Sequence, residues 1–300
     1  MTRPLLRFAP SPNGFLHLGH AYSALLNERI ARDLGGTWLL RIEDIDPVRA
    51  TPDRIAAVAQ DLAWLGLSWP HPVRHQSRHM AEYGRAAASL RGQGLLYPCF
   101  CSRSDVAAAV AAREPEGRAW LRDPDGIPLY PGTCRALSQP EVERRVAAGE
   151  PHAWRLDVEA ALRGETDIGW TRFDPDGGRE SRVAADPGRW GDVVLVRREV
   201  ATSYHLSVVV DDAAQGITHV VRGTDLAAAT DIHALLARRL GLALPRYHHH
   251  ALLTGPDGLK LAKSRDSHSL RAMRRAGADP HAIRAELGFA LACGFDPLDG

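Results

Sequence analysis

The chain has 300 residues, of which 45% are hydrophobic and 24% are charged, and its net charge is +1. This length allows one large domain or two smaller ones with a sizeable core. The near-neutral charge excludes a uniformly basic nucleic-acid binder, so any RNA contact must be a local patch. No apolar run is long enough to cross a bilayer and the start is not a secretory signal, which predicts a cytoplasmic protein.

The first hundred residues alternate between strand and helix patterns. Residues 5–9 predict a short buried strand, and the turn-rich stretch 10–14 follows it. A helical pattern covers residues 18–34, and residues 37–42 predict a second strand. The order strand, helix, strand indicates a βαβ unit and therefore a parallel sheet. Further helices are predicted over residues 53–65 and 80–91.

The middle of the chain has a different character. From about residue 97 to residue 187, Pro, Gly and Arg are frequent and periodicity is weak, which indicates an insertion with its own small structure. A helix is predicted within it over residues 105–113. The later elements predicted are strands over residues 193–196, 205–211, 218–221 and 249–254, and helices over residues 226–240 and 280–291.

Two histidines lie where the first strand leads into the first helix. His17 and His20 are one helical turn apart, with Gly19 between them. A helix start offers N–H groups and partial positive charge to an anion, and imidazole N–H groups also donate to phosphate oxygens. The pair therefore predicts a phosphate site. A metal pair and two surface histidines are the alternatives.

Lysine is confined to one short stretch. Of the 37 basic residues only Lys260 and Lys263 are lysines, and the other 35 (37 − 2) are arginines. A loop carrying two compact ammonium groups is suited to the phosphates of a nucleotide and to a leaving pyrophosphate. An exposed basic loop is the alternative, but it does not explain why both lysines are here.

Together these motifs resemble a known family. The segments around His17 and from Lys260 to Ser264 resemble the HIGH and KMSKS signatures of class I aminoacyl-tRNA synthetases, with Ala262 where the second signature often has Ser. Further stretches resemble the glutamyl branch: residues 7–17, 40–46, 204–212 and 221–226.

The resemblance extends to a shortened member of that branch. Only 36 residues (300 − 264) follow Ser264, too few for an anticodon-binding domain. The chain resembles the glutamyl-Q tRNA(Asp) synthetase family, which activates L-glutamate with ATP and magnesium and attaches it to the queuosine base of tRNA-Asp. The resemblance implies a ligase that needs no membrane, and a monomer is the simplest expectation.

The resemblance also implies a fold and its divisions. We expect an α/β protein with a Rossmann-type parallel sheet, an inserted small zinc-containing subdomain and C-terminal helices. The expected segments are the first half of the catalytic domain in residues 1–96, the acceptor-binding-like insertion in 97–187, the second catalytic half in 188–265 and a helical segment in 266–300.

The implied glutamate pocket pairs opposite charges with the substrate. Arg7 grips a carboxylate with two parallel hydrogen bonds, and Arg222 is a second candidate for that task. Glu43 holds the α-ammonium. Polar contacts come from Ser11 and Tyr204. A structural role is the alternative for each of these residues taken alone.

The implied ATP site uses the two signatures. His17, Gly19, His20 and Lys263 contact the nucleotide, and the catalytic set consists of both histidines together with Lys260 and Lys263. No protein nucleophile is needed, because the reaction depends on positioning and charge stabilisation.

The cysteines of the insertion predict a metal site. Cys99, Cys101 and Cys134 have a spacing that allows zinc, with a fourth ligand from Tyr130 or nearby, although free buried thiols are the alternative. The resemblance includes a Cys-x-Cys, Tyr and Cys site, and so implies one structural zinc ion held by these four residues. Cys293 is expected in a core.

Other functions remain open from the sequence. They are a minimal glutamyl-tRNA synthetase that charges a tRNA 3′ end, a non-catalytic synthetase-like binding module, and another nucleotidyl-transfer enzyme with the same phosphate signatures. RNA contact is expected from arginine clusters such as Arg271, Arg274 and Arg275, for which a solvated helix face is an equal alternative.

Overall fold

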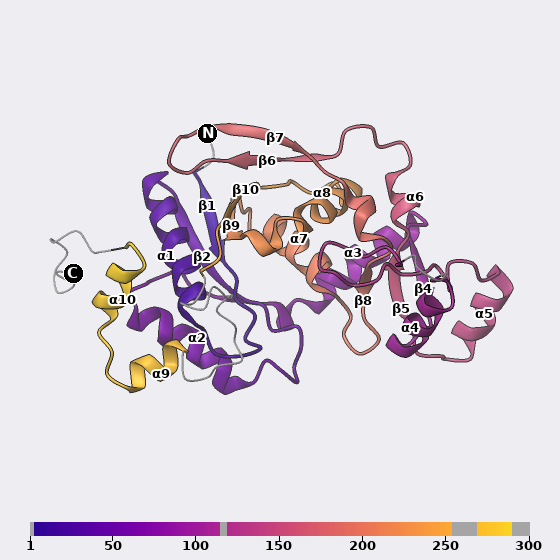
Figure 1. The fold of residues 1–300 in the computed structure, drawn as a ribbon, viewed down its shortest axis with the longest axis horizontal. Helices are drawn as coiled ribbons and strands as arrows, with labels where there is room; N and C mark the ends of the chain where they lie inside the picture. Colours follow the sequence, from indigo (N-terminus) through magenta and orange to yellow (C-terminus); the bar gives the residue numbers. More distant parts are fainter. Residues whose placement is uncertain (1–2, 115–118, 254–268, 290–300) are drawn as a thin grey trace. The chain divides into compact units, whose positions relative to one another are not determined.

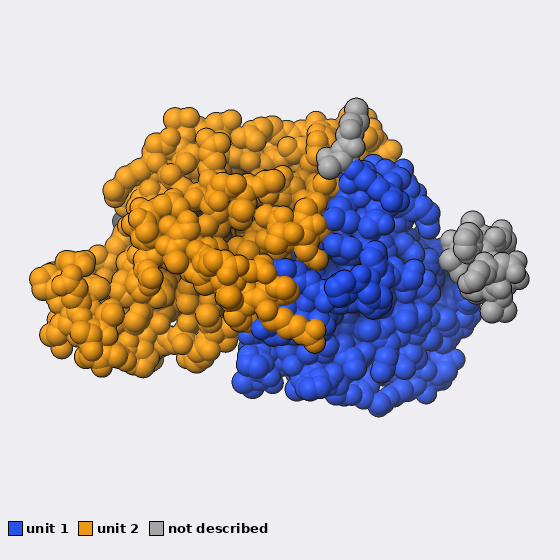
Figure 2. Space-filling view, turned by 180° about the vertical axis from the view of Figure 1, so that it is seen from behind, with its two compact units in different colours: residues 1–77, 219–225, 248–300 blue, residues 78–218, 226–247 orange. Residues whose placement is uncertain are grey.

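The computed structural model describes residues 3–114, 119–253 and 269–289. The chain forms two compact units, coloured in Figure 2. Unit 1 consists of residues 1–77, 219–225 and 248–300, and unit 2 of residues 78–218 and 226–247. Within the described ranges, no helix has the length and apolar character to span a membrane.

Unit 1 is built on the predicted βαβ unit (Figure 1). Strand β1 (Leu5–Phe8) pairs in parallel with β2 (Thr37–Ile42), with Leu5 opposite Thr37, and helix α1 (Leu18–Asp33) connects them. The short strand β3 (Arg74–His75) extends this sheet beyond β2. Strand β9 (His219–Gly223) lies beside β1. The structure thus confirms the expected α/β class with its parallel sheet.

Apolar periodicity explains these elements. In β1 and β2 the buried side chains include Leu6, Phe8 and Leu40, as expected for parallel strands covered on both faces. In α1 the buried residues recur at helical spacing and form a stripe that faces the sheet. Unit 1 is completed by α2 (Pro52–Trp64), α9 (Leu270–Arg275) and α10 (Pro280–Glu286).

Arginines attach helices α9 and α10 to α2. Arg274 Nε donates to Asp61 Oδ1 at 3.0 Å, and the Asp61 side chain is fully buried. Arg271 pairs with the exposed carboxylate of Asp53, and Arg284 Nη1 donates to Leu65 O at 2.9 Å. Two of the three arginines considered for RNA contact therefore have structural partners.

The core of unit 2 is helical. Helices α3 (Met80–Gly92), α7 (Tyr204–Ala214) and α8 (Ala229–Leu240) pack on one another. The fully buried side chains of Leu206 and Leu235 belong to this core. Tyr83 OH donates to Asp211 Oδ1 at 2.8 Å and so links α3 to α7.

One predicted strand was wrong: residues 205–211 belong to helix α7. The three consecutive valines favour a strand by local propensity, but buried residues occur on both sides of the helix, at positions such as Leu206, Ser207, Val209 and Asp212. A helix buried between α3 and α8 shows a continuous apolar run, which periodicity cannot distinguish from a buried strand. Tyr204 consequently begins a helix and does not precede a strand.

Unit 2 also holds two sets of strands. The antiparallel sheet has the order β4 (Leu96–Cys99), β5 (Ala153–Leu156) and β8 (Val194–Val196). Strands β6 (Gly169–Phe173) and β7 (Glu180–Ala184) form a hairpin. Strand β10 (Arg246–His250) pairs with β6 at Tyr247 and carries the chain into unit 1. It begins and ends earlier than the predicted strand over residues 249–254. The remaining helices are α4 (Arg103–Ala111), α5 (Gln139–Ala147) and α6 (Val158–Leu162).

Candidate functional site

The two histidines of the first signature cap helix α1 themselves. His17 is the N-cap residue, and its Nδ1 accepts a hydrogen bond from Gly19 N at 3.1 Å. His20 Nδ1 accepts from His17 N at 3.2 Å, which completes a reciprocal capping box, and the two ring centroids are 4.0 Å apart. Because both Nδ1 atoms accept, each neutral ring carries its proton on Nε2, the nitrogen that then acts as a donor.

Gly19 leaves space for this capping geometry. A Cβ atom at position 19 would lie 2.9 Å from His17 Cε1 and 3.1 Å from His17 Nδ1, so the ring of His17 would have to shift. The family resemblance implied that Gly19 contacts the nucleotide. The structure adds that Gly19 leaves room for the ring of His17.

The chain returns to His17 after the lysine stretch. Leu270 N donates to Leu16 O at 2.7 Å, and His17 forms an isolated antiparallel bridge with Ser269. Lys260 and Lys263 themselves lie outside the described residues. The segment that follows them is therefore held beside the first signature.

Charged groups of the predicted glutamate pocket lie on neighbouring strands of unit 1. Arg7 is on β1 and Arg222 is on the adjacent β9, and both side chains are buried. Glu43 directly follows β2, and its N–H donates to Pro10 O at 3.1 Å, which brings the segment before Ser11 to the same edge of the sheet. This edge holds the carboxyl ends of parallel strands, where open α/β sheets bind ligands.

Arg41 and His249 are neighbours of this pocket that the sequence did not single out. The Arg41 side chain has no exposed surface, and its Nη2 lies 3.2 Å from Glu43 Oε1. Arg222 Nε donates to His249 Nε2 at 3.3 Å. Arg41 precedes Glu43 by two residues in an extended segment, so the two side chains are expected on the same face. This spacing is the sequence feature that could have predicted their contact.

Tyr204, the fifth residue predicted for the pocket, belongs to unit 2. It begins α7, and its ring lies 5.6 Å from the rings of His205 and His233, measured between centroids. His205 Nδ1 is 3.2 Å from His233 Nε2. Tyr204 is thus part of an aromatic cluster between α7 and α8.

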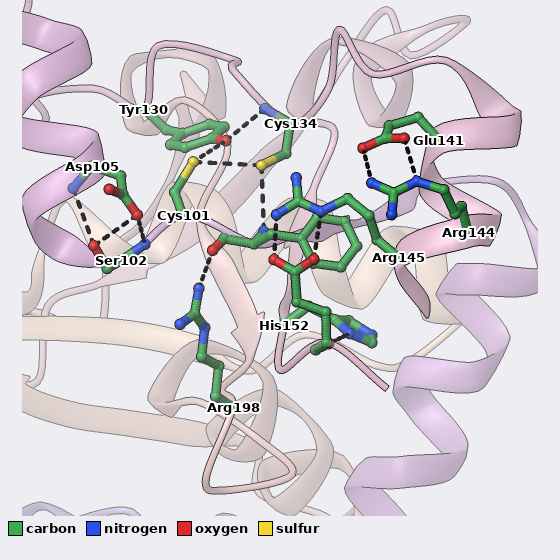
Figure 3. Close-up of polar contacts among 12 residues, drawn as sticks. Cys101, Ser102, Asp105, Tyr130, Cys134, Glu141, Arg144, Arg145, His152 and Arg198 are labelled. Carbon is green, nitrogen blue, oxygen red and sulfur yellow. Dashed lines mark hydrogen bonds and ion pairs between the residues drawn. The ribbon is translucent and has the colours of Figure 1, made fainter. Parts of the chain in front are cut away.

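The structure brings together the four residues of the predicted metal site. The Sγ atoms of Cys99, Cys101 and Cys134 all lie within 4.8 Å of one another. Tyr130 OH is 3.4 Å from Cys99 Sγ and 3.5 Å from Cys101 Sγ. Figure 3 shows Cys101, Tyr130 and Cys134 converging, with Cys101 Sγ and Cys134 Sγ 3.4 Å apart.

These distances match a tetrahedral zinc site. Zinc bonds of about 2.3 Å to sulfur and about 2.0 Å to oxygen place sulfur and oxygen about 3.5 Å apart at the tetrahedral angle, and two sulfurs about 3.8 Å apart. The observed oxygen–sulfur distances of 3.4 and 3.5 Å already have this value, and the sulfur–sulfur contact of 3.4 Å needs only a small expansion. Cysteine thiolates are also typical ligands of structural zinc ions.

Contacts within the cluster favour a thiolate at Cys99. The contact with the Cys134 thiol, followed by hydrogen bonds with Tyr130 and Arg155, lowers the pKa of the Cys99 thiol to about 4. The same contact with Cys99 raises the pKa of Cys134. Around the turn, Arg198 donates to Phe100 O, and Arg145 lies over the Phe100 ring, 4.1 Å from its centroid (Figure 3). A thiolate is the form that binds a metal ion.

Known proteins match the chain over nearly its whole length. The profile of the family described as tRNA synthetases class I (E and Q), catalytic domain, matches residues 5–290. The chain is 47% identical to a glutamyl-Q tRNA(Asp) synthetase of Rhodobacter capsulatus, covering 95% of this chain and 99% of that one. It is 38% identical to glutamate–tRNA ligase 2 of Nitrosococcus oceani, covering 92% and 57%.

Solved structures give the same relationship. The fold is similar to that of a glutamate–tRNA synthetase from Elizabethkingia anophelis, with a TM-score of 0.70 and 26% identity. This match covers 92% of the present chain and 54% of the other. The resemblance inferred from the sequence motifs is therefore confirmed.

Proposed function

Since the chain belongs to the family of class I tRNA synthetases of the E and Q type, we propose that it activates L-glutamate with ATP and transfers the glutamyl group to the queuosine base of tRNA-Asp. Family membership makes the chain an enzyme of the ligase type, so the non-catalytic binding module is no longer needed as an explanation. We further propose that the protein acts as a monomer in the cytoplasm, where ATP and tRNA are available.

The observation that carries the glutamate assignment is the pair of buried guanidinium groups of Arg7 and Arg222 on adjacent strands. A planar guanidinium matches a carboxylate with two parallel hydrogen bonds, which an amide cannot reproduce. Glu43 supplies the opposite charge for the substrate ammonium. Arg41 Nη2, 3.2 Å from Glu43 Oε1, orients that carboxylate.

In the proposed reaction, an oxygen of the substrate α-carboxylate attacks the α-phosphorus of ATP, and pyrophosphate leaves. The Nε2–H groups of His17 and His20 stabilise the negative charge that develops on the α-phosphate. Lys260 and Lys263 stabilise the negative charge on the leaving pyrophosphate. Magnesium accompanies ATP. Gly19 allows the close approach of these groups. Ser11 and Tyr204 complete the proposed contacts with glutamate.

The proposed acceptor is supported by the relatives. The glutamyl-Q tRNA(Asp) synthetase of R. capsulatus is matched over 99% of its length at 47% identity. A second candidate is charging of a tRNA 3′ end, favoured by the 38% identity to a glutamate–tRNA ligase, of which the chain spans 57%.

Transfer of labelled glutamate separates these two functions. We expect glutamate-dependent exchange between pyrophosphate and ATP, followed by label on queuosine-containing tRNA-Asp even after its 3′-terminal adenosine has been removed. An unmodified tRNA-Asp transcript is the matched control and should take up no label. Label that requires the 3′ adenosine, or that goes to tRNA-Glu, would establish the second candidate instead.

We also propose that Cys99, Cys101, Tyr130 and Cys134 hold one structural zinc ion. The side chains around it form a small cluster with few buried apolar residues, so a metal ion would contribute much of the local stability. Elemental analysis should give one zinc per chain, and Cys99→Ser should lose it. The matched control Cys293→Ser removes a cysteine outside the set and should keep the ion.

A further inference from the structure

Arg155 approaches the cysteine cluster from the neighbouring strand. In the antiparallel pair β4–β5, Tyr97 is opposite Arg155 and Cys99 is opposite Ala153. Alternate residues of a strand share a face, so Arg155 and Cys99 lie diagonally on one face of the sheet. Arg155 Nε donates to Cys99 Sγ at 3.2 Å.

The same guanidinium also contacts the fourth residue of the set. Its central carbon lies 3.9 Å from the centroid of the Tyr130 ring, within the range of a cation–π interaction. One side chain thus contacts a sulfur and the aromatic ring of the predicted oxygen ligand at once. No charged residue of the insertion was expected from the sequence to have this position.

The backbone carbonyl of Asp192 holds Arg155 in place. Arg155 Nη1 donates to Asp192 O at 2.7 Å. The Asp192 side chain is itself fixed, since it accepts from Tyr97 OH at 2.6 Å and from Val158 N at 3.1 Å. The guanidinium is therefore preorganised beside the cluster before any metal ion binds.

Charge balance explains why such a cation belongs there. A zinc ion with three thiolates and a neutral tyrosine has a net charge of about minus one, and with a tyrosinate of about minus two. A guanidinium that donates to the sulfur and lies over the ring compensates this excess of negative charge.

We infer that Arg155 is a positioning residue of the metal site, which orients Cys99 toward the ion and favours the Tyr130 oxygen as the fourth ligand. This inference rests on the proposed zinc site. It goes beyond that proposal because it assigns a role in ligand choice to a residue that does not bind the ion.

The test compares two arginines beside the cluster. Arg155→Ala removes the contacts with sulfur and ring, whereas Arg145→Ala removes an equal charge from a side chain that lies over Phe100 and pairs with Glu150. Zinc affinity is measured on the full chain by competition with a chromophoric chelator. We expect Arg155→Ala to weaken binding about 10- to 100-fold, as losses of residues that support metal ligands do, and Arg145→Ala to have a much smaller effect.

Cobalt(II) substitution provides a second measurement. The thiolate-to-cobalt and d–d bands report the donor set, so Arg155→Ala should shift them and Arg145→Ala should not. Arg155→Lys keeps the charge without the planar fork, so its zinc affinity and spectrum should lie between those of the wild type and Arg155→Ala. Arg155→Lys and Arg155→Gln replace Arg155→Ala in both measurements if that variant does not fold. Equal zinc affinities and unchanged spectra for the Arg155 variants would overturn the inference, whereas failure of the wild-type chain to bind zinc would overturn the underlying site.

Discussion

Replacing Gly19 by alanine tests whether the geometry of the first signature depends on the cap made by His17. The added Cβ would lie 2.9 Å from His17 Cε1, whereas ordinary contacts begin at 3.4 Å, so the ring must move by about 0.5 Å (3.4 − 2.9). The same movement weakens the 3.1 Å hydrogen bond from Gly19 N to His17 Nδ1.

The expected effect is on catalysis more than on stability. Loss of the cap costs about 1 kcal/mol, and replacing glycine by alanine in a helix returns about 1 kcal/mol, so the unfolding free energy should change little. A misplacement of about 1 Å in a catalytic group costs about 100-fold in rate. A shift of half that size, acting on donors aimed at developing charge, predicts a fall of about 10-fold in kcat for glutamate-dependent exchange.

Gly84→Ala is the matched control. Gly84 is on the exposed side of α3, and a Cβ there would meet no atom within 4 Å. We expect it to raise the unfolding free energy by about 0.5–1 kcal/mol and to leave exchange unchanged. If Gly19→Ala retained wild-type kcat, the ring of His17 would not need its observed position, and the assignment of the histidines to the α-phosphate would be wrong.

Three further predictions follow from other contacts. Arg274→Ala should cost about 3–5 kcal/mol in urea unfolding, because it leaves the buried Asp61 carboxylate without this ion pair, while Arg271→Ala at an exposed pair should cost less than about 1 kcal/mol. Burial raises the pKa of Asp61 above its usual 3.8. Without Arg274, the folded state therefore binds a proton at Asp61 that the unfolded state releases, and the variant's loss of stability should grow as the pH rises from 4 to 7. A loss of stability that does not depend on pH would contradict this. Arg7→Gln should lower kcat/KM for glutamate by about 100-fold or more and leave the KM for ATP nearly unchanged; equal effects on both substrates would argue against a carboxylate contact. Zinc removal by a chelator should lower the melting temperature of the wild type but not of Cys99→Ser, and identical shifts in both proteins would disprove a structural ion.

Local patterns in the sequence determined the elements that depend on near neighbours. The apolar stretches of β1 and β2 and the helical stripe between them predicted the βαβ unit, since each is a property of a few consecutive residues. The Cys-x-Cys pair and the His-x-x-His turn are likewise short spacings. For these motifs the family resemblance supplied roles that the spacings alone left open.

Only the tertiary structure decided features that depend on which distant segments meet. Residues 205–211 favour a strand locally but form α7, because burial between two other helices outweighs β propensity. Arg155 lies beside Cys99, 56 residues away in sequence, because of the register between β4 and β5. Arg274 is held by Asp61 across 213 residues, and this long-range pairing, which no local pattern encodes, gives a structural partner to an arginine that the sequence left open for RNA.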